Sequence, residues 1–330
     1  GSYVLSLVLH TQIQTVTGIP VYLVCFLMYA SLAGALGSSI TFVSLQAPRH
    51  RVTEVIGMLG SSGFLGMAVG PIIGDMIYAQ ENSLDSEDTL FIWKVHQLMW
   101  TAAAFGTVSW VSAIAATWGA AGRPQHIPRR PPSYLLVRKY QPGFLLVVSA
   151  GMGLGIGLFQ VFVRPFAGHI GVEHLRVFFL TYSLVAFTVR LSTGTLPARL
   201  GENRMIYIGF ATMALAMLSF VLVQSEWGLI LPACIAGTAH AFLFPAVIAS
   251  GCFAFPTRYR GLATTLMLAM FDFGNLIGRP LLGQSVGWFD ALGWDGYRMM
   301  FVTVACLLAG IAVAYAVTNR RSSGNRPSEA

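Results

Sequence analysis

The sequence predicts an all-α membrane protein that crosses the bilayer several times. Of its 330 residues, 55% are hydrophobic and only 10% are charged. Soluble domains carry about 25% charged residues. Several stretches, such as 144–163 and 229–254, are apolar over the roughly 20 residues that a membrane-spanning helix needs. A soluble fold of this size could not bury so much apolar side chain, whereas a lipid-facing surface is itself apolar.

Breaks at Pro, Gly and charged clusters divide the chain into about ten apolar segments. The segments are apolar on every side and do not alternate, so helices fit them and barrel strands do not. The predicted transmembrane helices are residues 1–17, 20–46, 53–79, 93–118, 142–163, 176–195, 205–223, 228–254, 259–287 and 298–318.

Basic residues concentrate in alternate loops, and this pattern predicts the topology. Of the 20 Lys and Arg residues, 14 lie in alternate loops and in the C-terminal tail. Two of the intervening loops are acidic, with Asp85 and Asp88 in one and Asp290 and Asp295 in the other. Because basic loops face the cytoplasm, we expect a cytoplasmic C-terminus. Positive charge spread over short loops does not indicate nucleic-acid binding.

A Pro- and Arg-rich stretch divides the chain into two helical bundles. It reads RPQHIPRRPPSYLLVRKY and is predicted to be a linker on the cytoplasmic membrane surface. The expected domains are a partial N-terminal bundle at 1–118, the linker at 119–141, a six-helix bundle at 142–318 and a cytoplasmic tail at 319–330.

Two stretches of the chain resemble each other and indicate an internal repeat. Pro48 lies 18 residues before Gly66, and Pro256 lies 18 residues before Gly274. Each stretch begins with a basic loop and continues into an apolar segment. The offset between the two stretches is 208 residues.

The same offset relates other segments. It maps 228–254 onto 20–46, whereas 142–163 and 176–195 map to positions before Gly1. We therefore expect two parallel halves of six helices each, with about ten helices present of an inferred twelve. The first two helices and the start of the third would then precede this sequence. Parallel repeats of this kind are typical of transporters.

Two motifs resemble those of the major facilitator superfamily of transporters. The stretch from Gly66 to Gly74, with Gly70 followed by Pro71, resembles the GxxxGPxxG motif on the fifth helix of that family. The stretch GTLPARLG resembles the second-half copy of the family's GxLxDRxG loop, although Ala198 stands where Asp is usual. The residues of this loop that match the motif are Gly194, Arg199 and Gly201.

The resemblance implies a fold of two helical bundles around a central cavity. It implies a secondary active transporter that moves a small organic solute by alternating access. Helices 20–46, 142–163 and 228–254 would line the cavity. The candidate solute contacts on these helices are Ser38, Ser39, Gln160 and His240.

The glycine motif also has a physical meaning of its own. Gly63, Gly66, Gly70 and Gly74 follow one another at three- and four-residue spacing, so they share one helix face. Small residues allow another helix to approach closely in lipid, and Pro71 favours a kink. In the family this motif is associated more with efflux antiporters than with uptake symporters, which slightly favours export. Ordinary helix packing explains the same glycines with no bearing on direction.

Asp272 is the clearest polar residue inside a predicted span. Charged residues in a span are costly and often functional. We hypothesise that Asp272 couples proton movement to solute movement, with Asn275 and Arg279 on the same helix face. A structural ion pair with Arg279 or Arg190 is the alternative. The position of the first half that matches Asp272 is Phe64, so this chemistry would differ between the halves.

Other polar residues in the spans allow two interpretations each. His240 lies near the middle of its segment and is either a pathway residue or a packing residue whose hydrogen bonds are satisfied. Arg190 and Arg164 either belong to the pathway or extend to the membrane surface. The run of glycines from Gly151 to Gly157 gives either tight packing or a flexible helix that lines the cavity.

The sequence contains no catalytic motif, no phosphate-binding loop and no metal-ligand spacing. We therefore expect no enzyme, no cofactor and no metal. The expected partners are the lipid bilayer of the cell membrane, a small-molecule substrate and a proton. A non-transporting sensor or assembly protein on the same fold is the alternative function.

Overall fold

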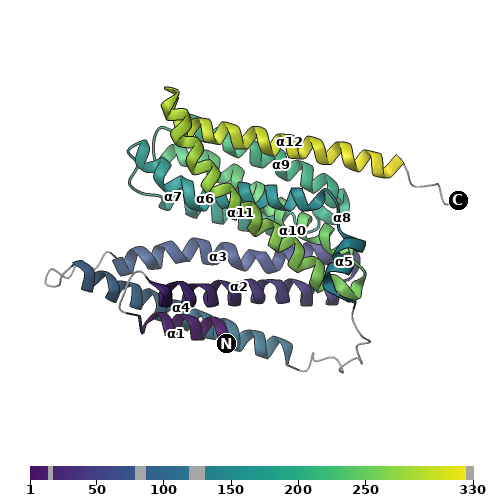
Figure 1. Ribbon diagram of the computed structural model, residues 1–330, viewed down its shortest axis with the longest axis horizontal. Helices are drawn as coiled ribbons and strands as arrows, with labels where there is room; N and C mark the ends of the chain where they lie inside the picture. The colour runs from purple at the N-terminus through teal and green to yellow at the C-terminus, as the bar shows by residue number, and fades with distance from the viewer. Residues whose placement is uncertain (14–17, 79–86, 119–130, 325–330) are drawn as a thin grey trace. The chain divides into compact units, whose positions relative to one another are not determined.

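The computed structural model describes residues 1–13, 18–78, 87–118 and 131–324 (Figure 1). The α-helices are α1 (Ser2–His10), α2 (Ile19–Gln46), α3 (Val52–Tyr78), α4 (Glu87–Thr117), α5 (Ser133–Tyr140), α6 (Leu145–His169), α7 (Arg176–Ser192), α8 (Leu196–Leu200), α9 (Glu202–Ser219), α10 (Ile230–Ala254), α11 (Arg260–Ala291) and α12 (Gly296–Gly324). Short 3-10 helices are η1 (Arg49–Arg51), η2 (Phe220–Leu222), η3 (Trp227–Leu229) and η4 (Thr257–Tyr259).

Eight helical segments within the described ranges are long and apolar enough to cross a membrane. They overlap α2, α3, α4, α6, α9, α10, α11 and α12. The other two predicted spans contain shorter helices, since α1 has nine residues and α7 has 17. At about 1.5 Å per residue, α7 approaches the roughly 30 Å thickness of the bilayer core. The fold is therefore the all-α membrane class that the sequence predicts.

The element boundaries repeat the 208-residue offset found in the sequence. Helix η1 at 49–51 and helix η4 at 257–259 differ by that number, as do the first residues of α3 and α11, Val52 and Arg260. Pro48 and Pro256 precede the two short helices with nearly equal dihedral angles, φ −56° and ψ 145° against φ −54° and ψ 147°. This agreement supports the internal repeat.

The chain forms two compact units, and α2 and α3 are each divided between them. The first unit comprises Gly1–Ser39 and Gly70–Leu135, and the second comprises Ile40–Val69 and Leu136–Ala330. In the first unit α1 packs on α4, where a Cβ atom added at Gly106 would lie 3.2 Å from the Tyr3 ring. The predicted linker lies mostly in 119–130, outside the described residues, and the predicted domain boundaries stay a prediction.

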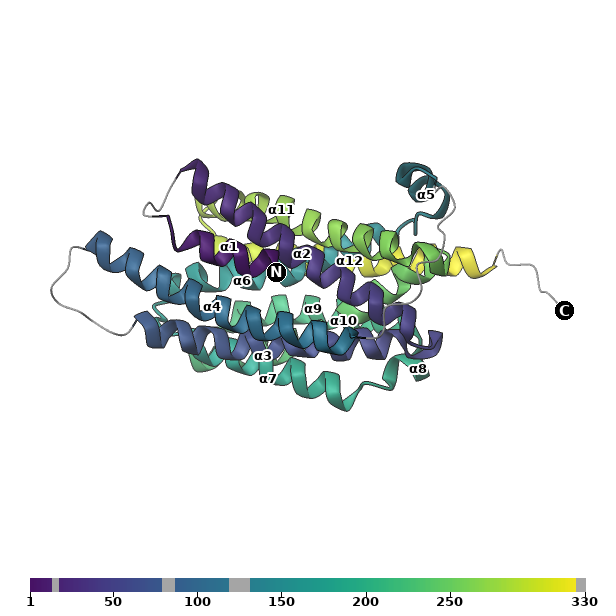
Figure 2. The ribbon, with the colours of Figure 1, turned by 90° about the horizontal axis from the view of Figure 1, so that it is seen from below.

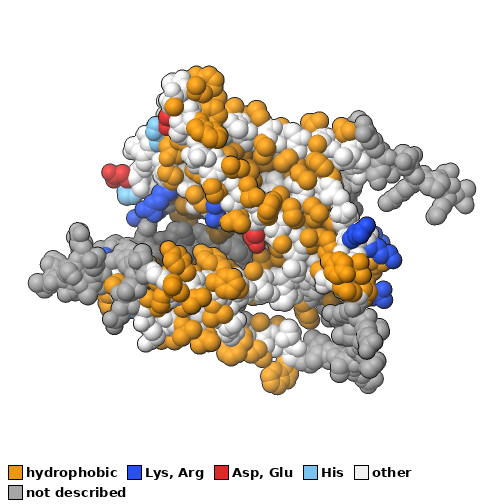
Figure 3. All heavy atoms as spheres, viewed as in Figure 1, with side chains coloured by type: hydrophobic (Ala, Val, Ile, Leu, Met, Phe, Trp, Pro, Cys, Tyr) orange, Lys and Arg blue, Asp and Glu red, His pale blue; other side chains and the backbone are white. Residues whose placement is uncertain are grey.

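The second unit has an aromatic core and an apolar outer surface. In Figure 1 its helix α11 runs obliquely across the nearly horizontal α12, and in Figure 2 both extend along the horizontal axis. Phe220 stacks on Phe301 with ring centroids 4.4 Å apart, and both side chains are fully buried. Leu222 and Leu276 are each 72% exposed, and hydrophobic side chains are spread over much of the described face in Figure 3. An exposed apolar surface of this kind suits contact with lipid.

Helices α6 and α11 cross at glycines and lie close together. A Cβ atom added at Gly153 would overlap the backbone oxygen of Phe271, and one added at Gly274 would overlap the backbone oxygen of Ala150. The glycine run of α6 therefore serves tight packing, which is the first of the two interpretations that the sequence allowed.

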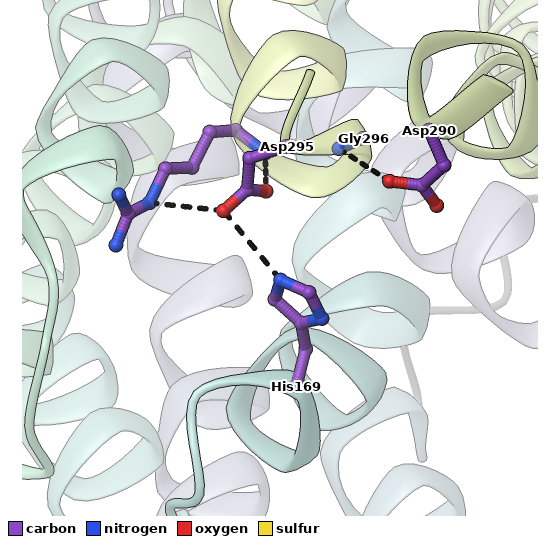
Figure 4. A network of polar contacts seen from close by, with 5 residues as sticks. His169, Asp290, Asp295 and Gly296 are labelled. Atoms are coloured by element: carbon purple, nitrogen blue, oxygen red, sulfur yellow. Dashed lines mark hydrogen bonds and ion pairs between the residues drawn. The ribbon is translucent and has the colours of Figure 1, made fainter. Parts of the chain in front are cut away.

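A polar network joins α6 to the turn between α11 and α12 (Figure 4). Asp295 precedes α12 and accepts a hydrogen bond from the backbone N–H of Arg298 at 3.0 Å. Its other oxygen, Oδ2, lies 3.5 Å from His169 Nε2 and 3.4 Å from Arg298 Nε. Asp290 Oδ1 accepts a hydrogen bond from the N–H of Gly296 at 2.9 Å. Both aspartates of the predicted acidic loop thus stabilise the turn.

Candidate functional site

The most enclosed polar group among the predicted site residues is the guanidinium of Arg190. This side chain on α7 is only 5% exposed, so it does not extend to the membrane surface. Its Nη2 donates hydrogen bonds to the carbonyl oxygens of His240 at 3.1 Å and Ala241 at 3.3 Å, on α10. Its Nη1 donates to the carbonyl oxygen of Gly57 on α3 at 3.3 Å. Carbonyl dipoles thus stabilise a buried cation that has no ion pair with any described carboxylate.

Pro245 explains why α10 offers a carbonyl to Arg190. Proline has no backbone N–H, so it leaves the carbonyl four residues earlier without its helical hydrogen bond. That carbonyl belongs to Ala241, one of the two on α10 that accept from Arg190. Buried carbonyl groups without a partner are costly, so Arg190 satisfies a need that the helix sequence itself creates.

Helix α3 has a slot without side chains, formed by Gly57 and Gly60, that accommodates the same arginine. A Cβ atom added at Gly60 would overlap Arg190 Nη1, and one added at Gly57 would lie 3.7 Å from Arg190 Cδ. One turn further along, the Phe64 ring centroid lies 4.7 Å from Arg190 Cζ, a distance suited to a cation–π interaction. The spacing of three and four residues places Gly57, Gly60 and Phe64 on one helix face.

His240 lies beside this group and is hydrogen-bonded through its side chain. The Tyr182 hydroxyl on α7 and His240 Nδ1 share a hydrogen bond, and the Phe64 ring packs edge-on against the imidazole at 4.9 Å. His240, Phe244 and Phe271 are half-buried and form an aromatic row with centroid distances of 5.9 and 6.1 Å. We call these three residues the aromatic row.

Sequence reasoning singled out Arg190 and His240 separately but missed Tyr182, Gly57 and Gly60. Phe64 appeared only as the counterpart of Asp272. The sequence did contain one signal for this group of residues, which is Pro245. A proline inside an apolar span frees a carbonyl that a buried donor can satisfy.

A small cavity of about 20 Å³ lies beside Arg190. A cavity of this size has room for about one water molecule. Thr53 and Glu54 on α3 contribute to its wall, and Glu54 is held by Arg51 in a two-fold contact at 2.9 and 3.0 Å. Thr53 Oγ1 donates to Glu202 Oε1 at 3.2 Å, which joins α3 to the start of α9.

Asp272 and Arg279 lie on the exposed flank of α11, away from the helices that bury Gly274. Within the described part of the chain no ion pair joins Asp272 to Arg279 or Arg190, and the role of Asp272 stays a prediction. Asn275 differs, because its side chain fills the space left by Gly157 on α6 and donates to the Phe271 carbonyl at 3.4 Å.

The remaining predicted solute contacts lie in both units. Gln160 on α6 is exposed and belongs to the second unit. Ser38 and Ser39 on α2 are exposed and belong to the first unit, where Ser38 Oγ donates to the carbonyl of Ala35 at 3.1 Å. Their role as solute contacts stays a prediction.

The two family motifs have different surroundings. Among the described residues, nothing lies within 4 Å of a Cβ atom added at Gly63, Gly66, Gly70 or Gly74, and the Pro71 side chain lies outside the description. The function of this glycine face stays a prediction.

In the loop motif, Gly201 has φ +79° and ψ 153°, a conformation that is open almost only to glycine. A Cβ atom added at Gly194 would lie 3.8 Å from Glu54 Cγ on α3. Arg199 is exposed on α8. The loop therefore meets the beginning of α3 next to the small cavity.

A family model described as Major Facilitator Superfamily matches residues 1–250. The chain belongs to this superfamily. It is 23% identical over 308 residues to the multidrug resistance protein MdtG of Enterobacter lignolyticus, which covers 90% of this chain and 70% of that protein. It is 27% identical over 139 residues to the uncharacterized transporter YybO of Bacillus subtilis, covering 42% of this chain and 31% of YybO.

A solved structure supports the same fold. The major facilitator transporter FucP, in its outward conformation, matches 95% of this chain and 80% of its own with a TM-score of 0.67 and 15% identity. The protein is thus a multi-pass membrane transporter of this superfamily and not an enzyme. In the described residues, no group of three or more His, Cys, Asp or Glu side chains is placed to hold a metal ion.

Proposed function

We propose that this major facilitator protein exports small organic solutes and uses proton movement to drive export. The observation that carries the proposal is the position of Asp272, an exposed carboxylate near the middle of the membrane helix α11. A carboxylate at this depth is costly and is usually retained for function. A group that binds a proton from one side and releases it to the other can couple the two movements.

The half-buried aromatic row of His240, Phe244 and Phe271 supports a solute of apolar or aromatic character. Such side chains offer broad apolar contact with few directional demands. Phe271 directly precedes Asp272 in the chain, so solute and proton would meet neighbouring residues of α11. The relatives named as multidrug resistance proteins support export and a broad range of substrates.

The proposal can be tested by dye export in cells that lack their own drug exporters. The protein is expressed from its complete reading frame, and three fluorescent aromatic probes are compared: ethidium as a cation, Nile red as a neutral solute and fluorescein as an anion. We expect the protein to lower the accumulation of at least one dye. An agent that abolishes the proton gradient should remove the effect.

Asp272→Asn keeps the size and polarity of the side chain but cannot carry a proton. We expect it to abolish export against a gradient while dye exchange across vesicle membranes continues. The matched control is Glu173→Gln, which removes an exposed carboxylate from the loop between α6 and α7. Normal gradient-driven export by Asp272→Asn between about pH 6 and 8 would overturn the coupling role. Failure to move any of the dyes would overturn the proposed substrate class.

A further inference from the structure

We propose that Arg190 is a conformational latch that holds α3 against α7 and α10 in one state of the transport cycle. The inference rests on the proposed transport function in one respect, namely that α3 and α10 separate during the cycle. It assigns Arg190 a positioning role and does not make it a solute or proton ligand.

The contacts of Arg190 divide into a permanent set and a releasable set. The carbonyls of His240 and Ala241 lie on α10, which follows the linker in the chain as α7 does. The Gly57 carbonyl and the Phe64 ring lie on α3, which precedes the linker. If α3 moves away, the α10 carbonyls still satisfy part of the guanidinium. The charge is therefore never left without an acceptor, which would be costly inside the membrane.

The slot on α3 is specific for this arginine. Gly60 has no side chain at the point where Nη1 lies, and Gly57 allows the aliphatic stem of Arg190 to approach the helix. A planar guanidinium can donate to two helices at once while its face lies on an aromatic ring, whereas a lysine ammonium is a compact point charge with no planar face to lie on the ring. The side chain thus recognises α3 through backbone and ring together.

Two further contacts join the end of α2 and the beginning of α3 to other helices. Thr53 on α3 donates to Glu202 on α9, and Arg260 Nη1 at the start of α11 donates to the Ser44 carbonyl at the end of α2. Thr53 is only 2% exposed, and its hydroxyl contacts Glu202 at the start of α9. A reagent can reach position 53 only when α3 leaves this surface, so this residue can report the state of the latch.

The test measures the labelling rate of a single cysteine, Thr53→Cys, by N-ethylmaleimide in the purified full-length protein without solute. The four native cysteines are first replaced by Ala; they are Cys25, Cys234, Cys252 and Cys306. We expect Arg190→Gln and Gly60→Ala to accelerate labelling on the order of tenfold, because each weakens hydrogen bonds of a charged group. Arg190→Lys should give an intermediate rate.

Two controls separate a latch from general loosening of the protein. Arg164→Gln removes an exposed arginine of α6, and Gly310→Ala adds a methyl group where no described atom lies within 4 Å. Both should leave the rate at position 53 unchanged. A second reporter, Ser219→Cys, lies buried on α9 and should keep its slow rate in every variant.

Two results would overturn the latch. One is an unchanged rate at position 53 in folded Arg190→Gln protein, and the other is equal acceleration at positions 53 and 219. Since the assay contains neither solute nor a proton gradient, its outcome is independent of the dye experiments.

Discussion

The carbonyl of Ala241 connects two residues that are 55 positions apart in the chain, Arg190 and Pro245. Proline removes the helical donor, and the arginine replaces it. The two side chains should therefore be energetically coupled even though the link between them is a backbone oxygen. Coupling of this kind is measured by a double-mutant cycle.

Pro245→Ala restores the missing N–H and keeps a Cβ atom at the position that faces Gly57. We expect Arg190→Gln to destabilise the protein less in the Pro245→Ala background than in the parent. The expected difference is about 1 kcal/mol, the usual worth of a hydrogen bond in a folded protein. Thermal unfolding of the four proteins in one detergent gives the measurement, and strict additivity would show that the Ala241 carbonyl does not depend on Arg190.

Single polar residues could be found from the sequence because they stand out in apolar segments. Arg190 and His240 were recognisable on that ground, but their common neighbour Tyr182 was not, since an aromatic residue is unremarkable in a membrane helix. Gly57 and Gly60 were equally invisible, because their importance depends on an arginine from another helix. Three-dimensional proximity was the missing information at this scale.

At the scale of helices, the crossing of α6 and α11 depends on the absence of side chains at a few positions. We predict that Gly274→Ala destabilises the protein by about 1–3 kcal/mol, because the added methyl group would overlap the Ala150 carbonyl and force the helices apart. Thermal unfolding in detergent measures the change.

Gly287→Ala is the matched control on the same helix. No described atom lies within 4 Å of a Cβ atom added there. It should leave stability unchanged or raise it slightly, since alanine favours helix more than glycine does. Equal losses for the two variants would mean that helix flexibility, and not the close approach of α6, explains the effect of replacing glycine in α11.

Hydropathy located the long helices because every membrane-spanning helix must satisfy its own backbone and present apolar side chains to lipid. Glycine spacing was a weaker guide to packing. The regular series from Gly63 to Gly74 meets no described neighbour, whereas the less regular glycines of α6 lie against the α11 backbone. The spacing of glycines shows that a helix face carries only small residues, but it does not show which helix approaches that face.

At the scale of the whole molecule, the alternation of basic and acidic loops predicts the side on which each loop lies. We expect cysteines at Arg258 and in the C-terminal tail to react with an impermeant thiol reagent from the cytoplasm, and a cysteine at Glu173 to react from the opposite side. Arg129 and Asp85, outside the described residues, should report the cytoplasm and the opposite side respectively.

Helix α7 is the element on which this topology depends most. Three long helices, α7, α9 and α10, lie between Glu173 and Arg258, while α8 between them has only five residues. If each long helix crosses once, the odd number of crossings places Glu173 and Arg258 on opposite sides. With 17 residues, and with Arg176 and Arg190 in its sequence, α7 is the shortest of the three. Because carbonyls of α10 and α3 accept hydrogen bonds from both terminal nitrogens of Arg190 inside the protein, its charge need not prevent α7 from crossing. Labelling of Glu173→Cys and Arg258→Cys from the same side would show that one of the three helices does not cross.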